Sequence, residues 1–383
     1  LAASSGRDLD AWRAAWLDTG GTDRLTLEPD GDGLVLAGRD PRPQVLAVGA
    51  YRREPDNPAL ERIRLVEVEV QGPRTPVRLP PADLYLINDE DLTFATSRPD
   101  DGSRDALLAA AGHLPAAISR GVAVATAWDL LVTGEATAAE VVRCLTGVLA
   151  VETSDSVIEP YLNLAADIAE LWASDADRPG LVAEVAAASA ALATDPDRRQ
   201  VALRTLARTA GDVDALAALT ADAGDDVDLR WRVLVRKSEL GGETAAEARR
   251  LLAEDQDPDA GLRALAVRAA APDPGEKAEI WRLLTGRAVP IGAFGRVAAA
   301  FWRPGQDDLL APYAEKFVEL LPGLHRGGMI LAMSYSSRLF PLFGIDEKFL
   351  DQAESAATQA APVVHKTVLE RADEVRRMLR SRS

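Results

Sequence analysis

The feature of this sequence that most constrains its fold is an abrupt change of hydrophobic period near Pro99. Before it, short β-branched or alternating segments are separated by Gly, Pro, Asp and Asn. The segment RLVEVEVQ at 64–71 alternates over its whole length, which predicts a strand with one face on a core and the other in water. Six or seven such segments between residues 23 and 98 predict a small β-sandwich.

From residue 99 to residue 383, apolar residues recur at three- and four-residue spacing, the period of amphipathic helices. No strict repeat is present, and successive short helices favour an irregular, HEAT-like αα-solenoid. A chain of 383 residues also exceeds what one core usually serves. The predicted fold class is therefore α+β and multidomain, with a small β-sandwich at 23–98 and a large all-α domain at 99–383.

Local start signals predict where several of these helices begin. A threonine followed three residues later by glutamate has the spacing of a capping box, and an aspartate before proline combines a capping carboxylate with a residue suited to the first turn. These signals are Thr137 with Glu140, Thr244 with Glu247, Asp195-Pro196, Asp257-Pro258 and Asp273-Pro274.

Residues 1–22 contain a short amphipathic helix of their own. Leu9, Trp12 and Trp16 recur at three- and four-residue spacing, and Gly20-Gly21 ends the pattern. Two tryptophans on one face of so short a helix need a surface to pack on. No partner for them is evident later in this chain, so we expect that surface to lie outside it.

Three consecutive acids, Asp89, Glu90 and Asp91, lie where the strand pattern gives way to the helical one. Carboxylates of this kind could chelate Ca²⁺ or Mg²⁺, which take several oxygen ligands. Three consecutive side chains of a strand cannot all point at one centre, however. We therefore interpret the run as turn and capping residues at a domain boundary.

The residues that most catalytic schemes need are scarce. The three histidines, His113, His325 and His365, are far apart in sequence and match no zinc-binding spacing. Neither a G-x-S-x-G elbow nor a P-loop is present. We expect each histidine to be a surface or cap residue, and we assign no catalytic residue and no metal ligand to this chain.

Charge and cysteine content restrict the partners. A formal net charge of −17 argues against nucleic acid, and no run of 18 apolar residues predicts a membrane span. The single cysteine, Cys144, lies in an apolar helical run, where we expect a buried and inert thiol. A cytoplasmic location is consistent with this cysteine usage.

Several stretches, in order along the chain, resemble the aminopeptidase N family of zinc metallopeptidases, and in particular its bacterial, actinobacterial-like members. The stretch at 5–21, SGRDLDAWRAAWLDTGG, resembles the closing helix of that family's catalytic domain. The stretch at 81–95, PADLYLINDEDLTFA, resembles the passage from its β-sandwich to its helical domain. DLRWRVLVRKSELGG at 228–242, FWRPGQDDLLAPYAEKFVELLPGL at 301–324 and VLERADEVRRMLRSR at 368–382 resemble segments of that helical domain.

The resemblance implies a non-catalytic region. In this family a preceding catalytic domain supplies an H-E-x-x-H helix that binds zinc and a G-x-M-E-N stretch that binds the free amine, and neither motif is present here. The chain is thus expected to begin at the last helix of that domain, at 1–22. The implied partners are the N-terminal catalytic domain of the same protein and peptide substrates, and the zinc belongs to the parent enzyme.

The resemblance also implies that the helical domain covers the active site and forms a chamber for peptides. In the FWRPGQ stretch we nominate Trp302, Arg303 and Gln306 as residues that face this chamber. The alternative for these residues is helix capping and packing. Two alternatives for the whole chain also stay open: an independent α-solenoid scaffold that binds a protein or peptide, and an unrecognised enzyme that uses the acid run and a metal.

Overall fold

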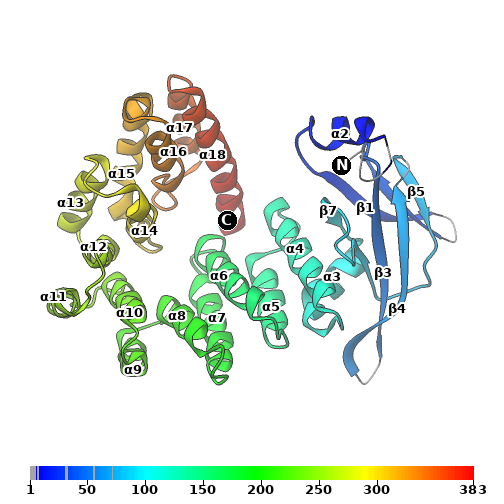
Figure 1. The fold of residues 1–383 in the computed structure, drawn as a ribbon, viewed down its shortest axis with the longest axis horizontal. Helices are drawn as coiled ribbons and strands as arrows, with labels where there is room; N and C mark the ends of the chain where they lie inside the picture. Colours follow the sequence, from blue (N-terminus) through cyan, green and yellow to red (C-terminus); the bar gives the residue numbers. More distant parts are fainter. Residues whose placement is uncertain (1–5, 7, 31–32, 55–56, 71) are drawn as a thin grey trace. The chain divides into compact units, whose positions relative to one another are not determined.

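The computed structural model of the chain describes residues 6, 8–30, 33–54, 57–70 and 72–383. By their internal contacts the residues form two compact units, Leu1–Ser154 and Asp155–Ser383. Figure 1 shows strands and a few helices in the first unit and helices throughout the second. This confirms the predicted fold class, whereas the domain boundaries expected at residues 22 and 98 stay predictions.

The strands of the first unit form two sheets. Their bounds are β1 (Asp23–Asp30), β2 (Gly33–Gly38), β3 (Gln44–Glu54), β4 (Asn57–Val70), β5 (Arg74–Val77), β6 (Leu84–Ile87) and β7 (Ala95–Arg98). One sheet has the order β5-β2-β1-β7 and the other β4-β3-β6. All pairings are antiparallel except that of β1 with β7, which is parallel. The sequence had not indicated β7.

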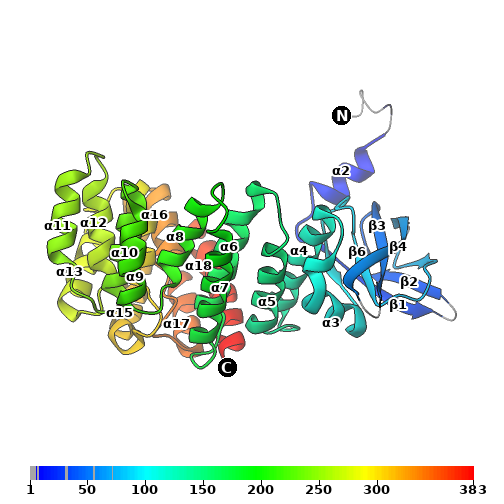
Figure 2. The same cartoon turned by 90° about the horizontal axis from the view of Figure 1, so that it is seen from below.

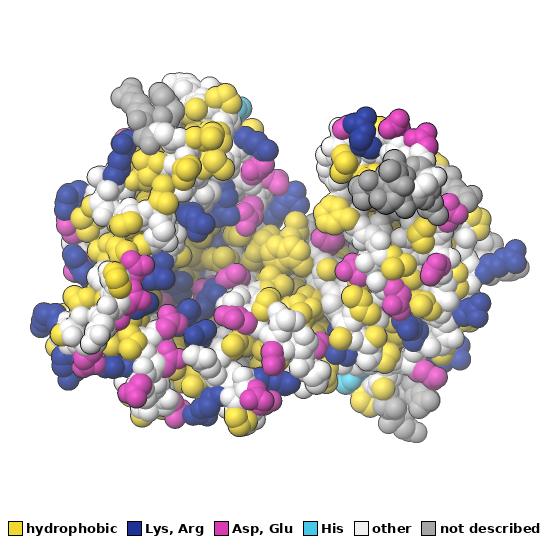
Figure 3. All heavy atoms as spheres, viewed as in Figure 1, with side chains coloured by type: hydrophobic (Ala, Val, Ile, Leu, Met, Phe, Trp, Pro, Cys, Tyr) yellow, Lys and Arg dark blue, Asp and Glu magenta, His cyan; other side chains and the backbone are white. Residues whose placement is uncertain are grey.

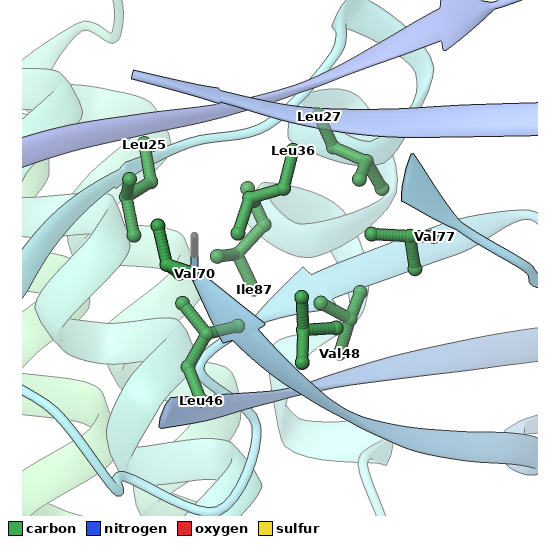
Figure 4. Close-up of a cluster of buried hydrophobic side chains, with 9 residues drawn as sticks. Leu25, Leu27, Leu36, Leu46, Val48, Val70, Val77 and Ile87 are labelled. Carbon is green, nitrogen blue, oxygen red and sulfur yellow. The ribbon is translucent and has the colours of Figure 1, made fainter. Parts of the chain in front are cut away.

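The core of the sandwich lies between these two sheets. Leu25 and Leu36 from one sheet meet Leu46, Val48 and Ile87 from the other, and all five are buried (Figure 4). Burying an aliphatic side chain of this size contributes about 1.5–3 kcal/mol each. Strand β4 alternates as expected, because its valines at 68 and 70 are buried while the glutamates between and before them are exposed.

A short helix, α2 (Asp10–Trp16), precedes the strands, and none of its residues is buried. The expectation that both tryptophans lack a partner in this chain is wrong for Trp16. The guanidinium of Arg42 lies 5.1 Å from the centre of the Trp16 ring, and the indole Nε1 donates to the carbonyl of Pro43. Trp12 is 41% exposed. The sequence pattern did not indicate this partner, because the cation–π contact joins residues 26 positions apart and local spacing does not reveal it.

The helices of the first unit follow β7. They are α3 (Asp101–Ala110), the 3₁₀ turn η1 (Ala111–His113), α4 (Ala117–Thr133) and α5 (Ala138–Leu149). The capping box predicted at the start of α5 is confirmed. The hydroxyl of Thr137 accepts from the backbone N–H of Glu140, whose carboxylate accepts from the backbone N–H of Thr137 at 2.8 Å.

The regular elements described in the second unit are all helices. They are α6 (Asp155–Leu171), α7 (Arg178–Leu192), α8 (Arg199–Thr209), α9 (Val213–Ala223), α10 (Val227–Glu239), α11 (Ala245–Glu254), α12 (Ala260–Ala270), α13 (Pro274–Thr285), α14 (Ile291–Phe301), α15 (Asp307–Leu320), η2 (Leu321–Gly327), α16 (Met329–Arg338), α17 (Glu347–Ala357) and α18 (Pro362–Arg382).

These helices stack in two layers. Each even-numbered helix from α6 to α16 contacts the next even-numbered one, and α7, α9, α11 and α13 each contact the helices before and after them in the chain. The result is a curved row of helices (Figures 1 and 2). The last helix returns to the first, because Arg382 Nε donates to the carbonyl of Leu171 at 2.7 Å. This arrangement agrees with the predicted irregular solenoid.

Of the other four predicted helix starts, those at Thr244 and Asp273 are confirmed in position, and those at Asp195 and Asp257 are wrong. Asp273 caps α13 by accepting from the backbone N–H of Glu276 at 2.8 Å. Asp195 and Asp257 instead accept from the backbone N–H two residues later, so each closes a turn before its helix begins. Thr244 makes no side-chain cap. Its expected partner, Glu247, pairs with Lys237 at 2.6 Å.

Within the described residues, no helix combines the length and the apolar character that crossing a bilayer requires.

Candidate functional site

The inner layer of the second unit surrounds a cavity of about 300 Å³. Figure 3 shows charged side chains gathered where this unit is hollowed. Seven of the fourteen lining residues are arginines, and only two are acids. The lining consists of Arg204, Arg208, Asp228, Trp231, Arg232, Val235, Arg236, Glu239, Arg263, Ala266, Arg296, Ala299, Ala300 and Arg303. We call this space the arginine cavity.

Helix periodicity explains how these arginines come together. Arg204 and Arg208 are four residues apart on α8, and Arg232 and Arg236 are four residues apart on α10, so each pair shares one helix face. Because α8 and α10 are neighbours in the inner layer, the two pairs face the same space. The sequence-based search missed them. Their i, i+4 spacing was the available signal.

A chain of alternating charges runs beside the cavity and joins α6, α8, α10 and the loop after α14. In order, its members are Asp167, Arg208, Glu170, Arg303, Glu239 and Arg236. The N–O distances along it are 2.6, 2.9, 3.5, 2.9 and 2.7 Å. We call it the charge chain.

The central members of the charge chain are withdrawn from water. The side chains of Glu170, Glu239 and Arg303 are 4%, 6% and 14% exposed. Burial acts to raise the pKa of Glu170, but the positive charges of Arg303 and Arg208 outweigh it and lower that pKa to about 2. The two glutamates, Glu239 above all, likewise raise the pKa of Arg303 against the effect of its burial. Both groups are therefore ionised over the whole physiological pH range.

The three nominated chamber residues lie close together but in different surroundings. Arg303 lines the arginine cavity. Trp302 is 2% exposed, packs against Phe301 and Trp281, and donates from Nε1 to the carbonyl of Leu339 at 3.2 Å. Contact with a peptide stays a prediction for all three residues.

The third nominated residue, Gln306, is 7% exposed. It donates from Nε2 to the carbonyl of Ala270 at 3.0 Å, and its Oε1 has no hydrogen-bond partner among the described residues. Its amide thus links the loop after α14 to the end of α12.

A second, more apolar cavity of about 730 Å³ adjoins the charge chain. It shares Arg236 and Glu239 with the arginine cavity. Much of its remaining lining comes from aliphatic side chains of α7, α8 and α9, including Val182, Leu206 and Leu219. The second unit therefore has a charged cavity and an aliphatic cavity that adjoin each other at Arg236 and Glu239.

The acid run in the first unit forms a turn, as expected, but it caps no helix. Asp89 is fully buried, and its two carboxylate oxygens lie 2.8 and 2.7 Å from the hydroxyl of Tyr51. Asp89 and Glu90 share Arg62, at 3.3 and 2.6 Å. All three acids lie in the turn that follows β6, which the backbone N–H of Asp91 closes by donating to the carbonyl of Asn88 at 2.8 Å. The capping expectation is wrong because α3 is capped by Asp100.

The other candidate groups are dispersed. His113 is exposed and His365 is half-buried, while the side chain of His325 lies outside the described part. Cys144 is buried as predicted, and burial raises the pKa of its thiol to about 12. Among the described residues, no group of three or more His, Cys, Asp or Glu side chains is placed to hold a metal ion.

Comparison with known families identifies the chain. The model of the ERAP1-like C-terminal domain family matches residues 84–377, which is more than half of the sequence. The chain belongs to this family. The match includes α3 to α17, most of α18, β6 and β7, and therefore the arginine cavity and the charge chain.

One relative aligns with the whole sequence. The chain is 26% identical over 427 aligned residues to the protein named "Aminopeptidase N" of Streptomyces lividans. The alignment covers 100% of this chain and 49% of that protein, so the chain spans about half the length of this relative. The resemblance to a C-terminal portion of the aminopeptidase N family is thereby confirmed.

Proposed function

We propose that this chain is the non-catalytic C-terminal region of a zinc-dependent aminopeptidase that removes N-terminal residues from peptides. In this proposal the helical domain covers the active site of a catalytic domain and shapes the chamber that peptides enter. The family match and the name of the Streptomyces lividans relative support the parent activity. Because the chain spans about half of that relative, the remaining half is where we place the catalytic domain.

The observation that carries the chamber role is the curved inner layer with its two adjoining cavities. A curved stack of helices offers an extended concave surface for a ligand chain. The arginine cavity can bind carboxylates of a peptide, and the aliphatic cavity can accept apolar side chains. Such a surface contributes to catalysis by positioning a substrate and excluding water. Arg303 is the nominated residue that lines the charged part.

The zinc of the parent enzyme is not assigned to this chain. A catalytic zinc takes three protein ligands from His, Asp, Glu or Cys, and the part of the chain described by the structure contains no such group. A cytoplasmic location of the parent protein remains part of the proposal, supported by the single cysteine, which leaves no internal disulfide.

The proposal is tested by comparing this chain with the longer protein that also contains the catalytic domain. The coding sequence upstream of residue 1 is read first, and we expect it to encode H-E-x-x-H and G-x-M-E-N. The longer protein and the 383-residue chain are then assayed with an aminoacyl-arylamide. We expect turnover by the longer protein only. Turnover by the 383-residue chain, or an upstream sequence without both motifs, would contradict the proposal.

The chamber role has its own test in the longer protein. Arg303→Ala should lower kcat/KM for peptides of eight or more residues more than for dipeptides, which we expect to be too short to reach the helical domain. A matched control is Arg282→Ala, whose side chain is 68% exposed on α13 and pairs with Glu279. Unchanged kinetics for both substrate lengths would remove Arg303 from the proposed chamber.

The alternative function is an independent α-solenoid scaffold for a protein or peptide. The two cavities favour it as well, because both lie within the second unit alone. The upstream sequence distinguishes the two functions, since a scaffold requires no catalytic motifs there.

A further inference from the structure

The arginine cavity has a positively charged lining, although the chain as a whole is negatively charged. The chain carries a net charge of −17, whereas the cavity is lined by seven arginines and two acids. The two acids are already engaged: Glu239 pairs with Arg236 and Arg303, and Asp228 pairs with Arg232 at 2.7 Å. The surface that a ligand meets in the cavity is therefore mainly one of guanidinium groups.

Several of these guanidinium groups retain unused donors. A guanidinium has five N–H donors. Toward the described part of the chain, Arg232 donates from Nε alone, to Asp228. The Nε atom of Arg204 lies 3.5 Å from a carboxylate oxygen of Asp228 and, like the Nε atom of Arg303, is buried without a hydrogen bond to the described residues.

Arg296 completes the set. It is exposed on α14, and no ion pair to it is found in the described part of the chain. Three guanidinium groups from α8, α10 and α14, and a fourth from the loop after α14, thus face one space with more donors than the protein satisfies. The buried Nε atoms of Arg204 and Arg303 are costly without a partner, and the exposed groups of Arg232 and Arg296 are open to a ligand, so this arrangement favours an anionic ligand.

The size and the remaining lining of the cavity define the ligand further. At about 30 Å³ for each water molecule, a cavity of about 300 Å³ holds a small molecule rather than a folded partner. Guanidinium groups bind oxyanions with paired N–H···O bonds. Val235, Ala266, Ala299 and Ala300 add small apolar contacts that suit a short carbon framework.

We propose that the arginine cavity binds a compact organic anion with two or more carboxylate groups. The carboxylates are held by Arg296, Arg232, Arg204 and Arg303, and the carbon framework contacts the alanines of α12 and α14. Such an anion bridges three inner helices and the loop after α14, so its binding also stabilises the curvature of the second unit. The same chemistry can be presented by a free polycarboxylate or by acidic side chains of a peptide.

The first experiment measures citrate binding to the 383-residue chain by calorimetry at fixed ionic strength. We expect one saturable site that is weakened about tenfold or more by Arg296→Ala and by Arg232→Ala, since each removes charged hydrogen bonds. Both side chains are exposed, so the variants are expected to fold, and thermal melts confirm it. Arg282→Ala on α13 is the matched control and should bind citrate unchanged.

The second experiment distinguishes the two sources. An Asp-Glu dipeptide, acetylated and amidated so that only its side chains are charged, is titrated against bound citrate. Displacement supports the site and assigns it to acidic peptides, and retention of citrate supports a free anion. Pyrophosphate that binds as well as citrate would overturn the choice of a carbon-based anion. Absence of saturable citrate binding, or equal binding by the Arg296 and Arg232 variants, would overturn the site itself.

The citrate result is independent of the proposed aminopeptidase function, because binding is measured on this chain without a catalytic domain.

Discussion

The hydroxyl of Tyr51 lies 2.7 and 2.8 Å from the two carboxylate oxygens of Asp89, and both residues are fully buried in the first unit. The hydroxyl of Ser119 on α4 is hydrogen-bonded to the same Tyr51 hydroxyl at 3.1 Å. Burial and the charge of Asp89 raise the pKa of Tyr51, so the phenol keeps its proton and remains a donor. This network joins β3, the end of β6 and α4, and it provides the first test of the fold.

Gly49→Ala should strongly destabilise the chain. A Cβ atom at this position would lie 2.0 Å from Oδ2 of Asp89 and 2.8 Å from the Tyr51 ring. The variant must displace a buried carboxylate from its partners, which we expect to lower the free energy of unfolding by about 2–4 kcal/mol. Chemical denaturation of both proteins measures the difference.

Gly147→Ala is the matched control for this substitution. Gly147 is exposed within α5, and beyond its chain neighbours and its own helix backbone no described atom lies within 4 Å of an added Cβ. Alanine is the better helix former, so this variant should gain about 0.5–1 kcal/mol. Equal stability of the two alanine variants would contradict the importance of the space beside Asp89.

The network also shows where sequence-based prediction of this fold ends. The strand with alternating valines and glutamates was predictable because the alternation is local. Asp89 was not, because its environment is set by Tyr51 and Arg62, which lie 38 and 27 residues earlier in the chain. The parallel pairing of β7 with β1 is equally non-local. A run of acids looks like a solvated turn until the fold brings a phenol and a guanidinium to it.

For the candidate site, too, the sequence predicts local spacing but not contacts between distant segments. The spacing of Arg232 and Arg236 places them on one helix face, and this could be read from the sequence. Their convergence with Arg296 could not, because it depends on how α10, α12 and α14 pack in the inner layer. Trp302 was nominated for the chamber from its place in a motif, while its burial against Phe301 and Trp281 depends on contacts between helices.

Arg303→Ala should destabilise the second unit far more than an exposed arginine substitution does. It leaves Glu239 with Arg236 alone and Glu170 with Arg208, and both glutamates are nearly inaccessible to water. Removing one partner of a buried ion pair typically costs about 3–5 kcal/mol. Arg282→Ala, the exposed control, should cost less than about 1 kcal/mol. Urea denaturation at pH 7 measures both.

The Arg303 effect should also depend on pH. Arg303 contributes to the lowered pKa of Glu170, which is about 2 against an ordinary value of 4.5. A lowered folded-state pKa stabilises the fold above the unfolded-state pKa, and that stabilisation is lost as the pH falls from about 4.5 to about 2. The stability difference between the parent and Arg303→Ala should therefore shrink across this interval. A difference that stays constant from pH 7 to pH 3 would contradict the ionic origin of the effect.

Lys277 should make stability rise with pH in the alkaline range. It is fully buried on α13 and donates from Nζ to the carbonyls of Ala269 and Phe301, both at 2.7 Å. Burial lowers its pKa from 10.5 to about 7. The unfolded chain therefore binds more protons than the folded chain between these values, and the free energy of unfolding increases from pH 7 to pH 10.5.

Lys277→Met isolates this contribution, since the other titrating groups remain in both proteins. Stability measured by denaturation at several values between pH 6 and pH 10 should rise by a few kcal/mol (about 1.4 per pKa unit) more steeply in the parent than in the variant. Parallel curves for the two proteins would mean that Lys277 does not titrate in this interval.

The closure of the second unit depends on Arg382 at the end of α18. Its Nε donates to the carbonyl of Leu171, its Nη1 donates to the carbonyl of Leu342 at 3.0 Å, and its guanidinium lies 4.8 Å from the centre of the Phe343 ring. One side chain thus joins the last helix to the end of α6 and to the loop before α17.

Arg382→Ala should release this junction while leaving the rest of the helical unit folded. Hydrogen exchange should become faster at the end of α18 and around residues 169–173. The substitution removes both the donor to the carbonyl of Leu171 and the side chain that packs on the Phe343 ring. The free energy of unfolding should fall by about 1–3 kcal/mol, the cost of charged hydrogen bonds. Arg380→Ala is the matched control, since Arg380 is exposed two residues earlier on the same helix. If both variants exchange alike, the last helix is held by its apolar face and not by Arg382.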